Sequence, residues 1–368
     1  MRVLYFTRDF TGHDHRFLSA LARTDHQVYV LRLERRNSAR AEQMLPGGVE
    51  QIDWMRDRVP FRWQHGPALV NDLKKVIDRV QPDLVHAGTV QTAAFLTALS
   101  GFKPLVTMTW GSDLLVDADR NWLWRWATHY TLARTSVLVG DCKAVQDKAA
   151  RFGFSPERTV IFPWGVDLDR FQPGESKLRK QLGWEDRFVL LSLRSWEPIY
   201  GVDLLVRAFL RTAHVVPQMR LLLLGEGAQA ARLHSILASS ELRDRVYLAG
   251  HIDHAELPQY YRAADLYVSA SYSDGSSVSL LESLACACPV LVSDIPGNLE
   301  WIEEGRQGWL FPTGNEEALA NAMQRASEQR ARLSGMAQAC RCLAEARANW
   351  EKNFEKLLVA YDLATNSR

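Results

Sequence analysis

Two acidic residues, Asp274 and Glu282, stand eight positions apart in the stretch SYSDGSSVSLLESLACACPVLVSD. The first lies in a glycine-serine loop and the second in a short apolar helix pattern. Because they do not share one helix face, we expect them to hold different parts of one extended ligand. The start of the helix offers free N–H groups that favour a diphosphate. The residues that enter it are Gly275, Ser276, Ser277 and Val278.

A simpler interpretation makes Asp274 an acid at the helix N-terminus and Glu282 a surface residue. A diphosphate also needs positive charge beside it. Arg194, in SLRSWEPIYGVD, follows an apolar strand pattern and could hold phosphate oxygens with both arms of its guanidinium. The context of the two acids and the position of this arginine favour a ligand site.

Two Asp-x-Asp sequences could instead supply a metal cation for the phosphate. They are DAD at 117–119 and DLD at 167–169. Asp119 stands where a helix cap is expected and Asp167 in a turn-rich segment, so we expect structural roles for both. We therefore predict no metal and no separate cofactor.

Composition limits the class of protein. A chain of 368 residues is long enough for two domains, and 44 basic against 43 acidic residues give a net charge of +1. Nucleic acid is therefore not an expected partner. The five cysteines include the pairs Cys286/Cys288 and Cys340/Cys342, whose C-x-C spacing suits small core residues better than a zinc knuckle. With no N-terminal or membrane-spanning apolar run, we expect a cytoplasmic protein.

Strand and helix patterns alternate along the chain, which predicts the α/β class with two doubly wound sheets. The strands expected in the first sheet are 3–6, 27–33, 83–88, 104–110, 136–140 and 159–165. Those expected in the second are 187–194, 219–227, 245–250, 265–271 and 289–294. We place the first domain at 1–170 and the second at 171–349. A terminal helix at about 350–368 has an apolar face to bury, formed by Trp350, Phe354, Leu357 and Tyr361.

The sequence resembles the retaining GT-B glycosyltransferases of family 4. The resemblance rests on GVDLDRF at 165–171, ADLYVSAS at 264–271 and the long stretch that begins DGSSVSLLESLACAC. It implies two Rossmann-like domains that face an interdomain cleft, the first for an acceptor and the second for a nucleotide-sugar donor. It also implies that the terminal helix at about 350–368 packs back on the first domain. The family signature, an acid followed after seven residues by Glu, corresponds to Asp274 and Glu282, with aspartate in place of the usual first glutamate.

The resemblance also implies the roles of residues in the second domain. Asp274 should contact the donor sugar, Glu282 the ribose and Arg194 the diphosphate, while His251 and Ile252 should lie near the base. The family's phosphate-binding lysine is absent, and Tyr200 occupies its place. Ala287 stands where the family usually has glycine; a left-handed conformation there would cost alanine about 1 kcal/mol.

The first domain departs from the family in its TWGSD sequence, where His-Gly-x-Asp is often found. We expect Trp110 and Asp113 of this sequence to lie on the acceptor side. Histidine chemistry, if it is needed, would then come from the loop after the first strand, where His13 and Asp14 are candidates.

The resemblance therefore implies a metal-independent, retaining hexosyltransferase that makes a glycan, glycolipid or cell-surface polysaccharide. Its co-substrate would be a UDP- or GDP-linked sugar and its acceptor a glycan or a lipid-linked molecule. Two alternatives remain open at this stage: a nucleotide-sugar epimerase of the same architecture, and a catalytically silent nucleotide-sugar-binding protein.

Two aromatic-basic segments of the first domain could seat the protein on the inner face of an anionic membrane. They are WMRDRVPFRW at 54–63 and RNWLWRW at 120–126. The alternative is that these aromatic residues belong to the core. The sequence leaves the choice open.

Overall fold

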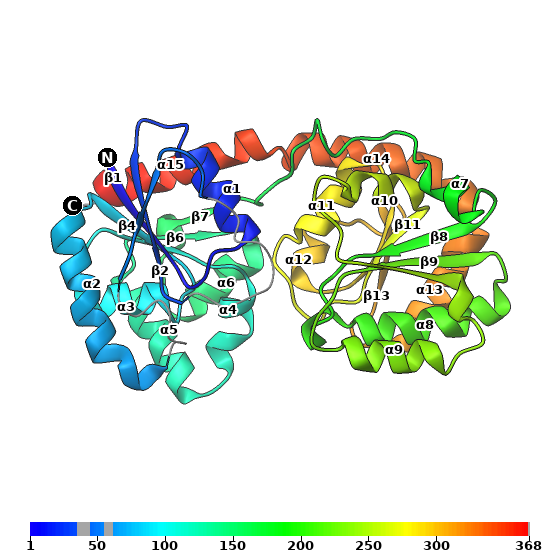
Figure 1. Cartoon of the computed structure of the whole chain (residues 1–368), viewed down its shortest axis with the longest axis horizontal. Helices are drawn as coiled ribbons and strands as arrows, with labels where there is room; N and C mark the ends of the chain where they lie inside the picture. The colour runs from blue at the N-terminus through cyan, green and yellow to red at the C-terminus, as the bar shows by residue number, and fades with distance from the viewer. Residues whose placement is uncertain (35–44, 55–61, 367–368) are drawn as a thin grey trace. The chain divides into compact units, whose positions relative to one another are not determined.

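The computed structural model describes residues 1–34, 45–54 and 62–366, which form two compact units (Figure 1). The first unit contains Met1–Phe162 together with Lys352–Arg368, and the second contains Pro163–Glu351. Each is built on a parallel sheet with helices on both faces, which confirms the expected α/β class. None of the helices in the described part of the chain is long and apolar enough to cross a membrane.

The first unit has seven parallel strands among its described residues. Their order across the sheet is β3 (Val49–Ile52), β2 (Gln27–Arg32), β1 (Arg2–Thr7), β4 (Leu84–Ala87), β5 (Leu105–Met108), β6 (Val137–Gly140) and β7 (Thr159–Ile161). The helices are α1 (Gly12–Leu21), α2 (Gly66–Val80), α3 (Ala93–Ser100), α4 (Ser112–Leu115), α5 (Trp122–Arg134) and α6 (Lys143–Arg151). The chain reverses its direction of winding between β1 and β4, where such sheets commonly bind ligands.

The second unit has six parallel strands. Their order is β10 (Val246–Gly250), β9 (Met219–Leu224), β8 (Phe188–Ser192), β11 (Leu266–Ser269), β12 (Val290–Ser293) and β13 (Gly308–Phe311). The helices are α7 (Leu178–Leu182), α8 (Val202–Val215), α9 (Ala230–Ala238), α10 (Leu257–Ala263), α11 (Val278–Ala285), α12 (Pro296–Leu299), α13 (Glu316–Glu328) and α14 (Leu333–Arg347). Here the winding reverses between β8 and β11.

Every predicted strand is present, although most are shorter than the apolar run that predicted them. Strands β3 and β13, each at an edge of its sheet, were not predicted from the sequence. The residues of β3, VEQI, have two adjacent polar residues between the apolar ends, and GWLF of β13 is four residues long and contains no β-branched residue. Neither segment therefore carries the long buried pattern that marks a central parallel strand.

The terminal helix α15 (Trp350–Asn366) buries the four aromatic and apolar residues expected to form its inner face. From Lys352 onward it belongs to the first unit. There the Tyr361 hydroxyl lies 2.6 Å from Nδ1 of His86 on β4, in the core of the unit. Burial lowers the pKa of His86 to about 3, so this contact joins two neutral side chains near pH 7.

The cysteines are mostly core residues. Cys286, Cys288 and Cys340 are buried, and burial raises the pKa of the Cys288 thiol to about 12, whereas Cys342 is exposed. No cluster of residues able to hold a metal ion occurs in the described part of the chain. The buried members of the two C-x-C sequences thus act as small apolar residues.

Helix α11 ends in a left-handed turn at an alanine. Ala287 has φ of 56°, immediately after the helix C-cap, Cys286. Glycine adopts this conformation without the steric cost that a Cβ atom imposes. We expect Ala287→Gly to raise the free energy of unfolding by about 1 kcal/mol, measured by urea denaturation.

A matched control lies two residues earlier, inside the same helix. Ala285→Gly should lower the free energy of unfolding by about 1 kcal/mol, since helical glycine loses more backbone entropy. Equal effects of the two substitutions would contradict the strain assigned to Ala287.

Candidate functional site

The site in the second unit forms between β8 and β11, where the winding of the chain across the sheet reverses. Strands β8 and β11 are parallel neighbours, so the loops at their carboxyl ends emerge side by side. Arg194 lies two residues beyond β8, and Asp274 lies in the loop between β11 and α11. The topology therefore brings together two residues that are distant in sequence.

Arg194 and Asp274 form an ion pair. Nη2 of the arginine lies 2.8 Å from Oδ2 of the aspartate, and 13% and 19% of the two side chains are exposed. The other arm, Nη1, donates hydrogen bonds to the Ser277 and Ser279 hydroxyls at 2.8 and 3.1 Å. The guanidinium is thereby fixed at the first turn of α11.

The ring of Tyr200 packs against the guanidinium of Arg194. The arginine Cζ lies 4.0 Å from the centre of the tyrosine ring, within cation–π range. Gly201 follows with φ of 59°, and a Cβ there would approach the Ala270 carbonyl oxygen to 2.3 Å. Burial disfavours the charge of Arg194, but Asp274 outweighs it, and the pKa of Arg194 is raised above its usual value. Arg194 remains a cation at any ordinary pH.

The loop before α11 is held by close backbone contacts. A Cβ at Gly297 of α12 would lie 2.3 Å from the Gly275 carbonyl oxygen, and the Trp301 indole donates a hydrogen bond to Ser276 Oγ at 3.1 Å. Gly275, Ser276 and Ser277 are buried, and Val278 begins the helix. No described side chain caps the N-terminus of α11. Its N–H groups remain suited to an anionic ligand.

Glu282 is buried, with 2% exposure, so its interpretation as a surface residue is wrong. Its Oε1 lies 2.7 Å from Nε2 of His254, and its Oε2 accepts a hydrogen bond from the Tyr261 hydroxyl at 2.9 Å. Burial and the carboxylate raise the pKa of Tyr261, so the phenol stays protonated and donates. The alternative interpretation of Asp274 as an acid at the helix N-terminus also fails, because α11 begins at Val278 after the N-cap Ser277 and has no acidic residue in its first turn.

Neither of the two partners of Glu282 was predicted from the sequence. His254 comes three residues after His251 and has a side chain that is 57% exposed. Its ring contacts Phe171, with 5.1 Å between the ring centres. The histidine spacing in HIDH, just after a predicted strand, was a signal for a polar residue at this edge of the sheet.

The two residues expected near the base follow β10. His251 is exposed, and Ile252 is partly buried and packs against the apolar cluster that contains Tyr261. These environments suit a polar contact and an apolar packing surface, respectively. Their proposed contact with a base remains a prediction.

In the first unit, His13 and Trp110 lie together, with ring centres 5.6 Å apart. His13 and Asp14 were expected in a loop, but both lie in the first turn of α1. Thr11 caps this helix in a capping box with Asp14, a pattern that the T-x-x-D spacing encodes.

The carboxylates of Asp14 and Asp113 take part in contacts within the fold. Asp14 also accepts a hydrogen bond from the Tyr5 hydroxyl at 3.0 Å. Asp113 accepts hydrogen bonds from the Thr109 hydroxyl and the Val90 amide, at 2.6 and 3.0 Å. Burial raises the pKa of both carboxyl groups, against the opposing effect of these hydrogen bonds. Such buried, well-bonded acids suit structural positions better than acceptor contacts.

The two Asp-x-Asp sequences have structural contacts. Asp167 forms a turn by accepting the Asp169 and Arg170 amides, each at 3.0 Å. Asp119 was expected to cap a helix, but Asn121 caps α5 instead. Asp119 pairs with Arg125, at 2.8 Å, and with Lys148. Its position just before the cap explains the error.

Comparison with known proteins identifies the class. Residues 13–170 match the family described as Glycosyltransferase Family 4, and residues 174–356 match Glycosyl transferases group 1. The chain belongs to the glycosyltransferases of the GT-B fold.

Its relatives include a D-inositol 3-phosphate glycosyltransferase of Geodermatophilus obscurus, 31% identical over 58% of this chain and 49% of the relative. The putative glycosyltransferase EpsD of Bacillus subtilis is 26% identical over 78% of each chain. The chain spans about half the length of the first of these. The crystal structure of Anabaena HepE in complex with UDP and glucose shares the fold, with a TM-score of 0.81 and 22% identity, covering 98% of this chain and 99% of HepE.

Proposed function

We propose that the protein is a retaining glycosyltransferase that moves a hexose from a nucleotide-sugar to a hydroxyl acceptor. One observation carries the proposal. Arg194 is fixed at the uncapped start of α11, between Tyr200 and Asp274, in a sheet whose winding reverses at that point. A cation beside a helix N-terminus suits a diphosphate, and a carboxylate beside both suits a sugar hydroxyl.

In this proposal, different residues bind the diphosphate, the sugar, the ribose and the base of the donor. The diphosphate takes Arg194 and the first N–H groups of α11, and it replaces Asp274 as the partner of the arginine. Asp274 is released to accept hydrogen bonds from the sugar. Glu282 accepts from the ribose, and His254 and Tyr261 hold its carboxylate in place. The base lies by His251 and Ile252.

In the transfer step, the bond between the sugar's anomeric carbon and the diphosphate oxygen breaks on the face where the acceptor oxygen attacks. The departing phosphate oxygen takes the proton of the acceptor hydroxyl, and the electron pair of the broken bond stays on the diphosphate. Arg194 and the helix N–H groups stabilise the charge that develops there. No protein nucleophile is required, and the configuration at the anomeric carbon is retained.

Chelation tests whether this chemistry needs a metal. We expect transfer activity to be unchanged by EDTA, because Arg194 and α11 supply positive charge to the leaving group. Both Asp-x-Asp sequences already have structural contacts. Activity would be measured after exhaustive chelation, with and without added magnesium or manganese. Loss of turnover that either ion restores would contradict the metal-independent mechanism.

The donor is proposed to be UDP-linked, a choice supported by the UDP and glucose bound to the structurally similar HepE. A panel of UDP-, GDP- and ADP-sugars tests this by thermal stabilisation, since a ligand that binds only the folded state raises the unfolding midpoint. At a concentration about 100 times its dissociation constant, the right donor should stabilise the protein by about 2.7 kcal/mol. Stabilisation by none of the panel would contradict the proposed function.

The acceptor is proposed to be a glycan or a lipid-linked molecule bound by the first unit, with His13 and Trp110 as its candidate contacts. An aromatic face and an imidazole suit a sugar ring and its hydroxyl groups. Appearance of a glycosylated acceptor would separate this function from epimerisation, which would convert the donor in the absence of any acceptor.

A further inference from the structure

The outward face of α5 is unusually aromatic. Trp122, Arg125, Trp126 and His129 recur at the spacing of one helix face, and all four are exposed. Trp122 is 80% exposed and Trp126 is 47% exposed. The opposite face buries Ala127, Thr128, Thr131 and Leu132. Trp126 also packs edge-on against the buried Phe95, with 5.6 Å between the ring centres, so Trp122 is the more exposed of the two tryptophans. Large apolar side chains on a solvent-facing helix commonly mark an interaction surface.

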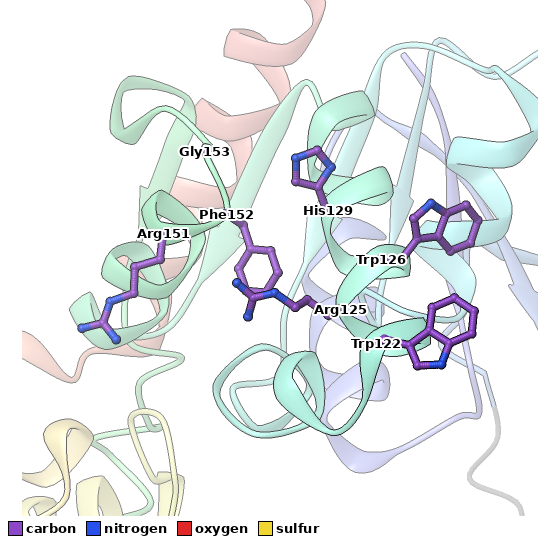
Figure 2. Close-up of a pocket in the computed structure, with 7 residues that line it drawn as sticks. All are labelled: Trp122, Arg125, Trp126, His129, Arg151, Phe152 and Gly153. Atoms are coloured by element: carbon purple, nitrogen blue, oxygen red, sulfur yellow. The ribbon is translucent and has the colours of Figure 1, made fainter.

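This face borders a depression of about 620 Å³ between α5 and the end of α6 (Figure 2). Figure 2 shows the two indole rings along one edge of this face of α5 and Arg125 along its other edge, near Phe152. The Arg125 guanidinium lies 5.1 Å from the centre of the Phe152 ring. Arg151 adjoins this phenylalanine and is exposed.

The chemistry of the lining residues selects the ligand. They include two arginines and a histidine, but no carboxylate and no side-chain amide, and the carboxylate of Asp119 lies beside the lining as the partner of Arg125. A site for a sugar needs side-chain acceptors for hydroxyl groups, and these residues offer mainly donors. Positively charged hydrogen-bond donors beside exposed indole rings suit instead the phosphate of a lipid headgroup, with the acyl chains of the lipid beneath it. Helix α5 itself carries no acidic residue.

We infer that this face of α5 and α6 binds the protein to a membrane that contains anionic phospholipid. The tryptophans enter the interface between headgroups and acyl chains, and Arg151 contacts the phosphates. Arg125 pairs with Asp119 at 2.8 Å in the structure, so a phosphate must replace this carboxylate before Arg125 can contact it. Of the two segments singled out by the sequence, 120–126 thus supplies the surface. In the other, Trp54 is buried and donates to the Arg32 carbonyl oxygen, and residues 55–61 lie outside the described residues.

Vesicle sedimentation tests the inference with phosphatidylcholine vesicles, with and without phosphatidylglycerol. The intact protein should bind only the anionic vesicles and should dissociate as salt rises from about 0.1 M to about 1 M, which shortens the screening length from about 10 Å to about 3 Å. Trp122→Ala should reduce the partition coefficient about tenfold through lost apolar burial. Arg151→Ala should reduce it about fivefold.

Two substitutions at exposed positions of the second unit serve as controls. Leu299→Ala and Arg243→Ala remove an exposed apolar and an exposed basic side chain, and both should bind vesicles as the intact protein does. Trp122→Ala should also keep the thermal midpoint, because the side chain is so exposed. A vesicle-induced blue shift of tryptophan fluorescence should be smaller in Trp122→Phe. The inference would be overturned by equal binding to both vesicle types or by undiminished vesicle binding of Trp122→Ala. It would also be overturned if this face mediated self-association or glycan binding while the protein bound no vesicles.

Discussion

Arg194→Ala should weaken the binding of free UDP and slow sugar transfer together. The substitution removes a fixed cation from the start of α11, and a hydrogen bond between charged groups contributes about 1.5 to 3 kcal/mol. We therefore expect UDP affinity to fall by about 10- to 150-fold in calorimetric titration. Transfer should fall further, because the contact strengthens as negative charge develops on the leaving group.

Arg194→Lys separates charge from geometry. Lysine keeps the positive charge but cannot bind two phosphate oxygens through a planar fork or stack on Tyr200 in the same way. This variant should recover part of the UDP affinity and less of the transfer rate.

An ion pair of similar burial elsewhere in the same unit controls for structural damage. Arg179 pairs with Asp265 at 2.8 Å, with side chains 20% and 14% exposed. Arg179→Ala should destabilise the fold but leave the UDP affinity of the folded protein unchanged. UDP binding by Arg194→Ala that equals that of Arg179→Ala would contradict the phosphate role.

Asp274→Asn should have the opposite profile, with normal or tighter UDP binding and little transfer. In the structure Asp274 occupies one arm of Arg194, and the diphosphate must replace it. Asparagine is similar in size but has no charge, so it competes less with the phosphate for the guanidinium. The sugar, in contrast, loses a charged acceptor for its hydroxyl groups, which is worth about 1.5 to 3 kcal/mol per hydrogen bond.

The measurements are calorimetric titration with UDP and a transfer assay with the intact donor. Glu282→Gln gives a useful comparison, because it should weaken UDP binding moderately through the ribose. The assignment of the sugar to Asp274 and of the diphosphate to Arg194 would be wrong if Asp274→Asn lost UDP affinity as severely as Arg194→Ala. It would also be wrong if transfer by Asp274→Asn were unchanged.

The central strands could be predicted because buried parallel strands have a distinctive composition. VLYF at 3–6 and PVLVSD at 289–294 are continuous apolar or β-branched runs between turn residues, and they correspond to β1 and β12. The edge strand β3 is half polar, and β13 has only three apolar residues after a glycine, none of them β-branched. Their pairing depends on the neighbouring strand, which local sequence does not reveal.

The candidate site was predictable to the extent that it follows from strand ends. Arg194 after β8 and Asp274 after β11 could be assigned to one region, since ligands bind at the carboxyl ends of parallel strands. Their direct ion pair could not be predicted, because it depends on side-chain rotamers across 80 residues of sequence separation. The contact of His254 with Glu282 depends likewise on how α10 and α11 pack, and only the structure reveals it.

Ala287 shows how a departure from a family pattern can be resolved. The sequence predicted strain at this alanine if its backbone were left-handed, and the φ of 56° shows that it is. Asp14 gives the opposite lesson. Its spacing from Thr11 is that of a capping box, so a local rule already explained a residue that had been assigned to chemistry.

A crystal structure of the protein with bound UDP would test the central claim most directly. Our account predicts that diphosphate oxygens lie within about 3 Å of the Arg194 guanidinium and of the N–H groups that begin α11. It predicts that the ribose contacts Glu282 and that Asp274 no longer pairs with Arg194. UDP bound elsewhere, or bound while the ion pair between Arg194 and Asp274 stays intact, would contradict the account.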